Sequence, residues 1–394
     1  MVHDLIVVGA GPVGCLIARK VAEKGFDVLV LEEHKSIGAP VQCAGLVTER
    51  AMKIGGIGRD CIQQEIRGAK IMGPGPECLV LSNPKRKVLV IDREAFDKNM
   101  AENAEDAGAE IRRGMRVVDL RQNGEHGVVK THNGNEHISL FIAGCDGPSS
   151  ITRRNMSLPP PPLLLMGVEV NAKVNQNKDL VVLRSSNKIA PGFFAWAIPL
   201  GDGMARIGLA VDPAKSSGNA KSYLMNIINK PSLLGLSKID VKTWMAGAIP
   251  LSPPGRTSAG NILLAGDAAC QVKSTSGGGV VMGLRCARHA ARTIVRELEN
   301  GPAGGSNLEN YDKAWKKDIG RELRRDWALH SYHASMSDAQ QAKALRLLSK
   351  PKTRDMINRL GDIDYPSKLV APLLWGNPSL LFMLPGLARR YLFP

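Results

Sequence analysis

The chain has 394 residues, which is too long for one ordinary hydrophobic core, so two domains or one elaborated domain are expected. Its formal net charge of +15 favours anionic partners such as nucleic acid, acidic proteins or anionic lipid surfaces. The seven cysteines include no Cys-x-x-Cys pair, which disfavours zinc ribbons, iron–sulfur clusters and dithiol oxidoreductases; no metal is expected, and a reducing cytoplasmic location fits.

The first predicted unit spans residues 5–34 and reads as strand, glycine turn, helix, strand and acid. Its first strand, Leu5–Val8, is a continuous apolar run, as in strands that are buried on both faces. It begins so close to Met1 that no signal peptide is expected. A helix follows to about Lys24, where Gly25 is expected to cap its C-terminus.

The turn of this unit carries the pattern G-x-G-x-x-G. Gly9 permits the tight turn, Gly11 lets a pyrophosphate approach the backbone, and Gly14 lets the helix and strand pack closely. After the second strand, Val28–Leu31, a carboxylate at Glu32 can accept both ribose hydroxyls of an adenosine. An acid at this position disfavours a 2′-phosphate, so NADP is not expected. The pattern predicts a dinucleotide site, and a purely structural glycine turn is the alternative.

Residues 193–196 are unusually rich in aromatic side chains and are predicted to lie in a strand. Phe193, Phe194 and Trp196 fall close together in a chain that has only 7 Phe, 5 Trp and 5 Tyr. This density favours a wall of a substrate site, and plain hydrophobic core is the alternative reading.

The segment 261–298 distinguishes FAD from NAD. Ile262–Ala265 reads as a buried strand, and Asp267 after it can hydrogen-bond the ribityl chain of a flavin. The run Gly277–Gly279 then opens a helix whose N-terminus would direct amides and a positive dipole end at the pyrimidine edge of a flavin. An NAD enzyme needs no such second site, so FAD is the predicted cofactor.

The C-terminal region contains two apolar segments, and no uninterrupted apolar run reaches the roughly 18 residues of a membrane span. Residues 311–333 place large apolar side chains four residues apart: Trp315, Ile319, Leu323 and Trp327. This spacing predicts an amphipathic helix, and we favour docking on the protein body over a membrane helix. Residues 369–394 are apolar, interrupted by prolines, and contain Arg389 and Arg390; they could cover the pocket or lie against lipid.

The element pattern predicts an α/β (α+β) fold in which a Rossmann-like FAD-binding domain is interleaved with a mainly β substrate domain. The FAD-binding domain is expected at residues 1–150 and 255–300, with an excursion at 48–90. The β-rich substrate domain is expected at residues 151–254, and residues 301–394 are expected to form a helical C-terminal region.

Together these segments resemble the FAD-dependent reductases and hydroxylases of the p-hydroxybenzoate-hydroxylase fold. Within that group the chain most resembles the geranylgeranyl reductases, especially the archaeal digeranylgeranylglycerophospholipid reductases. The resemblance covers roughly residues 4–300. Its further motifs are IGAPVQCAGLV (37–47), VLVIDREAFDKNMAENAEDAGAEI (88–111), GCDGPSS (144–150) and APGFFAWAIPLGDGMARIGLAV (190–211).

The resemblance implies cofactor contacts along most of the chain. The residues implied at the ADP part are Gly9, Gly11, Val13, Gly14, Glu32 and, through its backbone, Val117. The residues implied at the flavin and its ribityl chain are Cys43, Ala44, Gly45, Asp267, Gly279 and Val280. Arg93 is implied to contact the cofactor from the start of its helix.

The resemblance also implies a substrate wall formed by Phe193, Phe194, Trp196 and Pro199. The sequence departs from the family at Phe194, where Tyr is common, and at Ile198, where Phe is common. Both departures concern the shape of the pocket. Cys145 stands where Ala is common.

Several candidate residues also have plain structural interpretations. Cys43 could be a small buried residue, or it could shape the pocket or relay a proton, so it is a tentative catalytic residue. Arg93 could instead pair with Asp92 or Asp97. Lys273, just before the glycine run, could be an exposed lysine or could contact an anionic headgroup.

The resemblance implies an FAD-dependent reductase that saturates isolated C=C bonds in geranylgeranyl chains of archaeal membrane phospholipids, using a hydride from reduced flavin N5 and a proton. The expected partners are the isoprenoid phospholipid, a low-potential electron donor such as a ferredoxin, and a membrane surface that the protein contacts peripherally. Nucleic acid is not an expected partner. An FAD-dependent monooxygenase of the same fold is the main alternative, and a nucleic-acid-binding flavoprotein is a weaker one.

Overall fold

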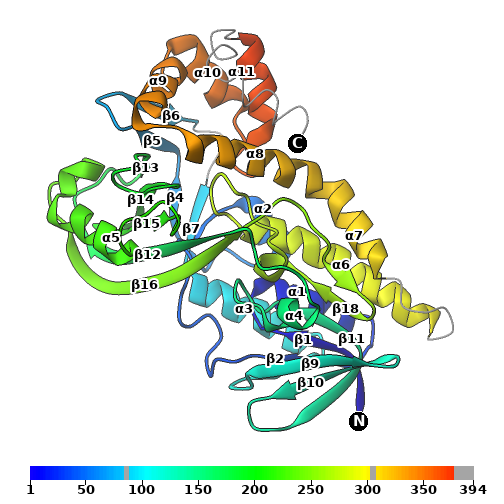
Figure 1. The fold of residues 1–394 in the computed structure, drawn as a ribbon. Coiled ribbons are helices and arrows are strands. Elements are labelled where there is room, and N and C mark those ends of the chain that lie inside the picture. The colour runs from blue at the N-terminus through cyan, green and yellow to red at the C-terminus, as the bar shows by residue number, and fades with distance from the viewer. Residues whose placement is uncertain (84–87, 302–307, 377–394) are drawn as a thin grey trace.

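The computed structural model describes residues 1–83, 88–301 and 308–376 (Figure 1). Within these residues the chain forms three β-sheets, a layer of helices on the first sheet, and a group of C-terminal helices. The α/β fold class predicted from the sequence is confirmed.

The eight-stranded sheet has the order β17-β18-β11-β1-β2-β8, and β10 and β9 extend from β11 as an antiparallel addition. Its strands are β1 (Val2–Val8), β2 (Val28–Leu31), β8 (Glu110–Arg112), β9 (Val117–Asn123), β10 (His126–Thr131), β11 (Glu136–Gly144), β17 (Ser258–Ala259) and β18 (Ile262–Leu264). β1 pairs in parallel with β2 and β11. Leu5 and Val7 of β1 face a core shared with α1 (Pro12–Ala22), α3 (Arg93–Asp106) and α6 (Val280–Asn300).

The predicted first unit is present with small differences at its ends. β2 has the predicted bounds, while β1 begins three residues before the predicted Leu5. The helix ends at Ala22 rather than near Lys24 because the chain leaves it through a turn in which the Gly25 amide bonds to the Ala22 carbonyl. Gly25 has a positive φ of 85°, as expected of a glycine that ends a helix.

The seven-stranded sheet has the order β16-β12-β15-β14-β13-β5-β6. Its strands are β5 (Gly68–Met72), β6 (Cys78–Ser82), β12 (Leu163–Lys173), β13 (Leu180–Arg184), β14 (Ala195–Gly201), β15 (Met204–Val211) and β16 (Asp240–Leu251). One face buries an apolar cluster with α5 (Ala220–Asn229). β5 and β6 belong to the predicted excursion at 48–90. They join this sheet because β5 pairs in parallel with β13.

Smaller elements connect these two sheets. β3 (Leu46–Thr48), β7 (Val88–Ile91) and β4 (Ile62–Ile66) form a three-stranded sheet. α2 (Glu49–Gly55) follows β3 directly in the sequence. The remaining short elements are α4 (Ile151–Asn155), η1 (Pro231–Leu234) and η2 (Gly266–Ala269).

The C-terminal helices cover the body of the protein. They are α7 (Glu309–Trp315), the π-helical turn η4 (Lys316–Gly320), α8 (Arg321–Ser335), α9 (Asp338–Leu348), α10 (Pro351–Leu360), η5 (Pro366–Leu369) and α11 (Val370–Gly376). Figure 1 shows α7 and α8 as one long rod beside α6, with α9 and α10 over β6.

The rod formed by α7, η4 and α8 is docked on the body, as favoured from the sequence. Trp315, Ile319 and Leu323 are buried in the core that α1, α3 and α6 share. Among the described residues, no helix combines the length and apolar character that a membrane span requires. Arg389 and Arg390 of the predicted lipid-facing tail lie outside the described residues.

Candidate active site

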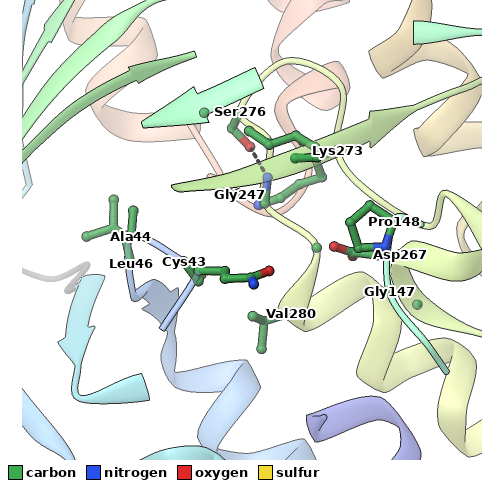
Figure 2. Close-up of a pocket in the computed structure, with 18 of the residues that line it drawn as sticks. Cys43, Ala44, Leu46, Gly147, Pro148, Gly247, Asp267, Lys273, Ser276 and Val280 are labelled. Carbon is green, nitrogen blue, oxygen red and sulfur yellow. Dashed lines mark hydrogen bonds between the residues drawn. The ribbon is translucent and has the colours of Figure 1, made fainter. Parts of the chain in front are cut away.

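One cavity of about 1400 Å³ extends from the glycine turn after β1 to the C-terminal helices. Its walls come from both large sheets, the loop before α6, and α8, α9 and α11. Figure 2 shows Cys43 and Ala44 on one side of this cavity, Pro148 and Asp267 on the other, and Val280 below them at the start of α6.

The glycine turn is built for close approach of a ligand to the backbone. Gly9 has a positive φ of 95°, and a Cβ there would lie 2.6 Å from the carbonyl oxygen of Cys145. A side chain at Gly14 would overlap the carbonyl oxygen of Gly9, so this glycine lets α1 pack against the turn. Gly11 instead faces open space, with nothing within 4 Å of an added Cβ. The amides at the start of α1 are therefore accessible to a phosphate group in the cavity.

Glu32 orders the glycine turn as well as bordering the cavity. Its Oε2 accepts a hydrogen bond from the Ala10 amide at 2.8 Å, and its Oε1 accepts one from the His34 amide at 2.9 Å. The sequence pattern predicted only a ribose contact for this carboxylate. The bond to Ala10 shows that Glu32 also fixes the turn in which Gly9 and Gly11 lie.

The buried side chain of Arg206 holds the loop that carries Cys43. Arg206 donates hydrogen bonds to the carbonyl oxygens of Ala44 at 2.8 Å and Cys43 at 3.4 Å. Gly45 has a positive φ of 69°, and its amide donates to the Cys43 sulfur at 3.5 Å. The thiol consequently sits at the cavity wall opposite Asp267 (Figure 2).

Arg93 makes one of the ion pairs considered for it and also lies at the cavity, where the resemblance implies a cofactor contact. Its guanidinium pairs with Asp97 at 3.0 Å, and its side chain also borders the cavity. Burial acts to lower the pKa of Arg93, but Asp97 and Cys43 raise it above its ordinary value, so the positive charge is retained. Asp92 does not pair with Arg93 and instead caps α3 by accepting from the Ala95 amide.

Asp267 lies at the cavity wall beside the glycine run. A Cβ on Gly279 would lie 2.7 Å from Oδ1 of Asp267, so only glycine fits between this carboxylate and the start of α6. Burial raises the pKa of Asp267 to about 6, although Arg93 acts to lower it. Within the described residues no donor reaches this carboxylate, which leaves it free for hydroxyl groups of a ligand.

These features fit FAD. The open backbone at Gly11 suits a pyrophosphate, the free carboxylate of Asp267 suits a ribityl hydroxyl, and the N-terminus of α6 suits the electron-rich edge of a flavin. The residues implied by the resemblance that line this cavity are Gly9, Gly11, Val13, Glu32, Cys43, Ala44, Gly45, Arg93, Val117, Asp267, Gly279 and Val280. Gly14 lies behind the turn, where it serves packing.

The aromatic residues form one wall of the cavity. Phe193 and Phe194 stack with their ring centroids 4.2 Å apart, and Trp196 meets Phe194 edge-on at 6.0 Å. Trp196 also donates from Nε1 to Glu169 at 3.2 Å, which fixes its ring. Because side chains alternate along a strand, Pro199 of β14 lies on the face opposite Trp196 and is not part of the wall.

Lys273 corrects the expectation of an exposed lysine. The residue is only 5% exposed, and its Nζ donates to the carbonyl oxygen of Ile363 at 2.7 Å and pairs with Asp364 at 3.2 Å. Its charge is thus used to hold the C-terminal region, because a buried ammonium requires a nearby anion. Because Asp364 already balances the Lys273 charge, less of this charge is available to bind the anionic lipid headgroup that was considered from the sequence.

The C-terminal helices contribute polar side chains that the sequence interpretation did not single out. His330 and His333 of α8 line the cavity. His333 Nε2 lies 2.9 Å from the Ser185 hydroxyl, which donates to Gln341 of α9 at 2.7 Å. The ring of His330 packs 5.9 Å from that of Phe193. The sequence signal that could have identified His330 is its position one helical turn after Asp326, on the same face of the helix.

Residues 3–326 of the chain match the protein family described as FAD binding domain. The chain is 30% identical to an uncharacterized protein of Methanocaldococcus jannaschii, over 94% of this chain and 95% of that protein. It is also 30% identical to digeranylgeranylglycerophospholipid reductase 2 of Methanopyrus kandleri, over 97% of this chain and 98% of the relative.

Among solved structures, the fold is similar to that of a geranylgeranyl bacteriochlorophyll reductase-like protein from Thermoplasma acidophilum. The TM-score is 0.84 at 23% identity, and the match covers 98% of this chain and 99% of the other. This likeness shows that the whole described body, including the C-terminal helices, has a precedent as one fold.

Proposed function

Because the chain belongs to the geranylgeranyl reductase family of FAD-dependent oxidoreductases, we propose that it saturates isolated C=C bonds in the geranylgeranyl chains of archaeal membrane phospholipids. FAD is its cofactor. The proposal concerns the substrate and the bond that is reduced.

The observation that carries the proposal is the apolar part of the cavity beside the flavin-binding residues. Its volume of about 1400 Å³ exceeds the range of about 300–1,000 Å³ that is typical of ligand pockets. The apolar side chains that line it away from the glycine turn are Ile71, Val181, Leu183, Ile198, Ile249, Leu329, Leu348, Val370, Leu373 and Leu374. Such a chamber suits a long hydrocarbon chain in addition to the cofactor.

The chain's own residues would position the alkene and keep water away from it. Reduced FAD, when bound, supplies a hydride. Trp196 and Ile198 of β14, and Phe194 just before this strand, line the cavity and can hold a flat trisubstituted double bond by contact with their side chains. Apolar side chains of the C-terminal helices, Leu329, Leu348 and Leu373, would reduce the access of water to a bound alkene, which would strengthen charge interactions at the reacting carbons.

An anaerobic single-turnover experiment tests the proposal. Holoenzyme is reduced with dithionite and mixed with a digeranylgeranylglyceryl phospholipid, and flavin absorbance and lipid mass are followed together. Flavin reoxidation with a gain of two hydrogens per double bond is the expected result. A flavin that stays reduced until air enters, with unchanged lipid, would refute the reductase and favour the monooxygenase alternative.

Two tryptophan variants give this experiment an internal comparison. Trp196→Ala removes the ring that Glu169 fixes in the cavity wall, so we expect at least a ~10-fold slower turnover because the alkene loses its alignment. Trp244→Ala changes a tryptophan that is 42% exposed on β16 and does not line the cavity, so its turnover should match that of the wild type. Equal turnover of both variants would contradict the assignment of the wall.

We further propose that electrons arrive from an acidic low-potential protein of the ferredoxin type. The net charge of +15 would attract such a donor, and attraction between proteins weakens with salt. Reduction by ferredoxin should slow as salt rises, while reduction by dithionite serves as the control. A ferredoxin rate that is independent of salt would contradict this proposal.

We also propose that the protein contacts a membrane surface peripherally, because its substrate is a phospholipid and its charge favours anionic headgroups. Sedimentation with anionic vesicles, compared with neutral phosphatidylcholine vesicles, tests this contact. Equal recovery with the two vesicle types would contradict a role for the charge.

A further inference from the structure

The side of α8 next to the glycine run carries buried polar atoms that the cofactor site does not use. Asp326 is 0% exposed and His330, one turn later, is 3% exposed. Three atoms in this region have no hydrogen-bond partner in the described structure: Asp326 Oδ2, His330 Nε2 and Ser274 Oγ. Four further atoms of this kind lie elsewhere in the described residues, but these three lie on two segments that meet through a hydrogen bond beside the cavity, which makes this region a candidate site.

Asp326 is connected to the cavity through one hydroxyl group. Thr275 donates from Oγ1 to Asp326 Oδ1 at 2.8 Å. Thr275 lines the cavity, whereas Asp326 does not. Thr275 therefore lies between the buried carboxyl and the chamber, two residues before Gly277 of the glycine run.

The surroundings of Asp326 raise its pKa above that of an ordinary aspartate. Burial raises its pKa to about 6, and the hydrogen bond from Thr275 and the charge of Lys273 act to lower it while Glu322 acts to raise it. Lys273 gives its own hydrogen bonds to the Ile363 carbonyl and to Asp364.

The other charged neighbour on α8 is similarly committed. Glu322 accepts from the Ser367 amide at 2.9 Å and from the Ser367 hydroxyl at 2.5 Å. His330 does not supply a counter-charge, because burial lowers its pKa to about 4 and it is neutral near pH 7. In the part of the chain that the structure describes, no cation pairs with Asp326, so its neutral acid form persists to higher pH than in an ordinary aspartate.

We propose that Asp326 stores the proton for the reduction and that Thr275 passes it into the cavity. This inference rests on the function proposed above, in which an alkene receives a proton and a hydride. When Asp326 is protonated, its carboxyl O–H can donate to Thr275 Oγ1 across this 2.8 Å contact, which frees the Thr275 hydroxyl proton to face the cavity. The π-electron pair of the alkene then forms a C–H bond with that proton as the Thr275 O–H bond breaks, and Thr275 takes the Asp326 proton in return. The second alkene carbon would accept the hydride that FAD, when bound and reduced, supplies. Asp326, left as a carboxylate, would regain a proton from solvent between turnovers.

The first test is independent of catalysis. Difference infrared spectra of oxidised holoenzyme between about pH 5 and about pH 8 should show the C=O stretch of a protonated carboxyl that ionises in this range. The buried Asp267, whose pKa is also about 6, contributes to this band, so Asp326→Asn should remove only the Asp326 part and lower the band's intensity. Asp355→Asn, which changes an aspartate that is 66% exposed on α10, should leave the intensity unchanged. A band of unchanged intensity in Asp326→Asn would overturn the proposal.

The second test is the pH profile of single-turnover alkene saturation. In the wild type the rate should fall about tenfold per pH unit above about pH 6, because the acid form becomes scarce. Asp326→Asn should lose this limb and react roughly 10²-fold to 10⁴-fold more slowly at low pH. A variant with the wild-type rate and profile would overturn the proposal.

The hydroxyl of Thr275 is tested by a pair of variants. Thr275→Val keeps the shape and removes the proton path, so a loss of roughly 10²-fold or more is expected, and Thr275→Ser should restore most of the rate. Equal rates for the two variants would refute the relay.

The tests also separate this inference from the proposed function. If lipid is not reduced but the infrared band is present and depends on Asp326, the substrate assignment fails while the stored proton stands. If lipid is reduced and no band depends on Asp326, the assignment of the proton store fails and the reductase stands.

Discussion

Asp364 connects the C-terminal helices to the cavity wall, and Asp364→Asn should loosen them. Its side chain is 2% exposed, and each oxygen has a partner: Lys273 lies 3.2 Å from Oδ1, while Thr48 donates to Oδ2 at 2.6 Å and Arg50 at 2.8 Å. These partners come from β3, α2 and the loop before α6, so the carboxylate joins three separate segments. The asparagine keeps the size of the side chain but removes its charge.

The expected magnitude follows from the burial of the pair. At 3.2 Å and an effective dielectric constant of about 20, the attraction between Lys273 and Asp364 is about 5 kcal/mol before desolvation is counted. Removing one partner of a buried pair typically costs about 3–5 kcal/mol, because the other charge stays buried without compensation. Local opening of the C-terminal region should become easier by this amount.

Hydrogen exchange of backbone amides measures this local opening. Since every 1.4 kcal/mol is about tenfold, amides of η5 and α11 should exchange roughly 10²-fold to 4 × 10³-fold faster in Asp364→Asn. Asp355→Asn is the control, because Asp355 pairs with Arg354 at the surface of α10, and such exposed pairs contribute about 0–1 kcal/mol. Equal exchange rates in the two variants would refute the reasoning.

The remaining predictions concern the cofactor, with FAD dissociation constants from flavin fluorescence as the measurement. Asp267 has a pKa of about 6 in the free protein, so its carboxylate, which can accept a ribityl hydrogen bond, is lost as pH falls. FAD affinity should therefore be constant above about pH 6 and weaken below it, and Asp267→Asn should remove this dependence. A wild-type FAD affinity that does not depend on pH would contradict the assignment of Asp267 to the ribityl chain. Glu32→Gln should weaken FAD binding by about 10-fold or more, since an amide cannot accept from Ala10 and His34 with both ends. Unchanged affinity in this variant would show that the turn is fixed by other contacts.

The features that could be predicted from the sequence are those with local signals. The run from β1 through Gly9, Gly11 and Gly14 to β2 needs only a glycine spacing, an apolar period and an acid, and all lie within one supersecondary unit. The aromatic wall was found from composition, because Phe193 and Trp196 stand out in a chain with few aromatic residues. Strand alternation, applied to the same segment, separates Trp196 from Pro199.

The features that could not be predicted depend on contacts between distant segments. Thr275 and Asp326 are fifty-one residues apart, and nothing in either segment alone shows that their side chains meet. The periodicity of 311–333 identified the apolar face of the rod but did not assign a role to its buried acid. Lys273 was expected at the surface for a similar reason, since its anion, Asp364, follows ninety-one residues later.

The loop between β18 and α6 brings these distant contacts together, and this arrangement predicts that they are coupled. Lys273 holds the C-terminal region, Thr275 meets Asp326, and Gly277–Gly279 leads into α6 at the flavin site. Because only Ser274 separates Lys273 from Thr275, releasing Lys273 should also disturb the geometry of the relay.

A double-mutant cycle measures this coupling through single-turnover rates. Asp364→Asn should slow alkene saturation when Asp326 is present, and it should slow it much less in an Asp326→Asn background, where the relay is already lost. Directly coupled residues typically differ from additivity by about 0.5–3 kcal/mol, which corresponds to roughly 2-fold to 150-fold in rate. Asp355→Asn, combined with Asp326→Asn in the same way, should be additive because both members of its ion pair with Arg354 are exposed. Additive effects of Asp364→Asn and Asp326→Asn would show that the loop anchors the helices and the proton path independently.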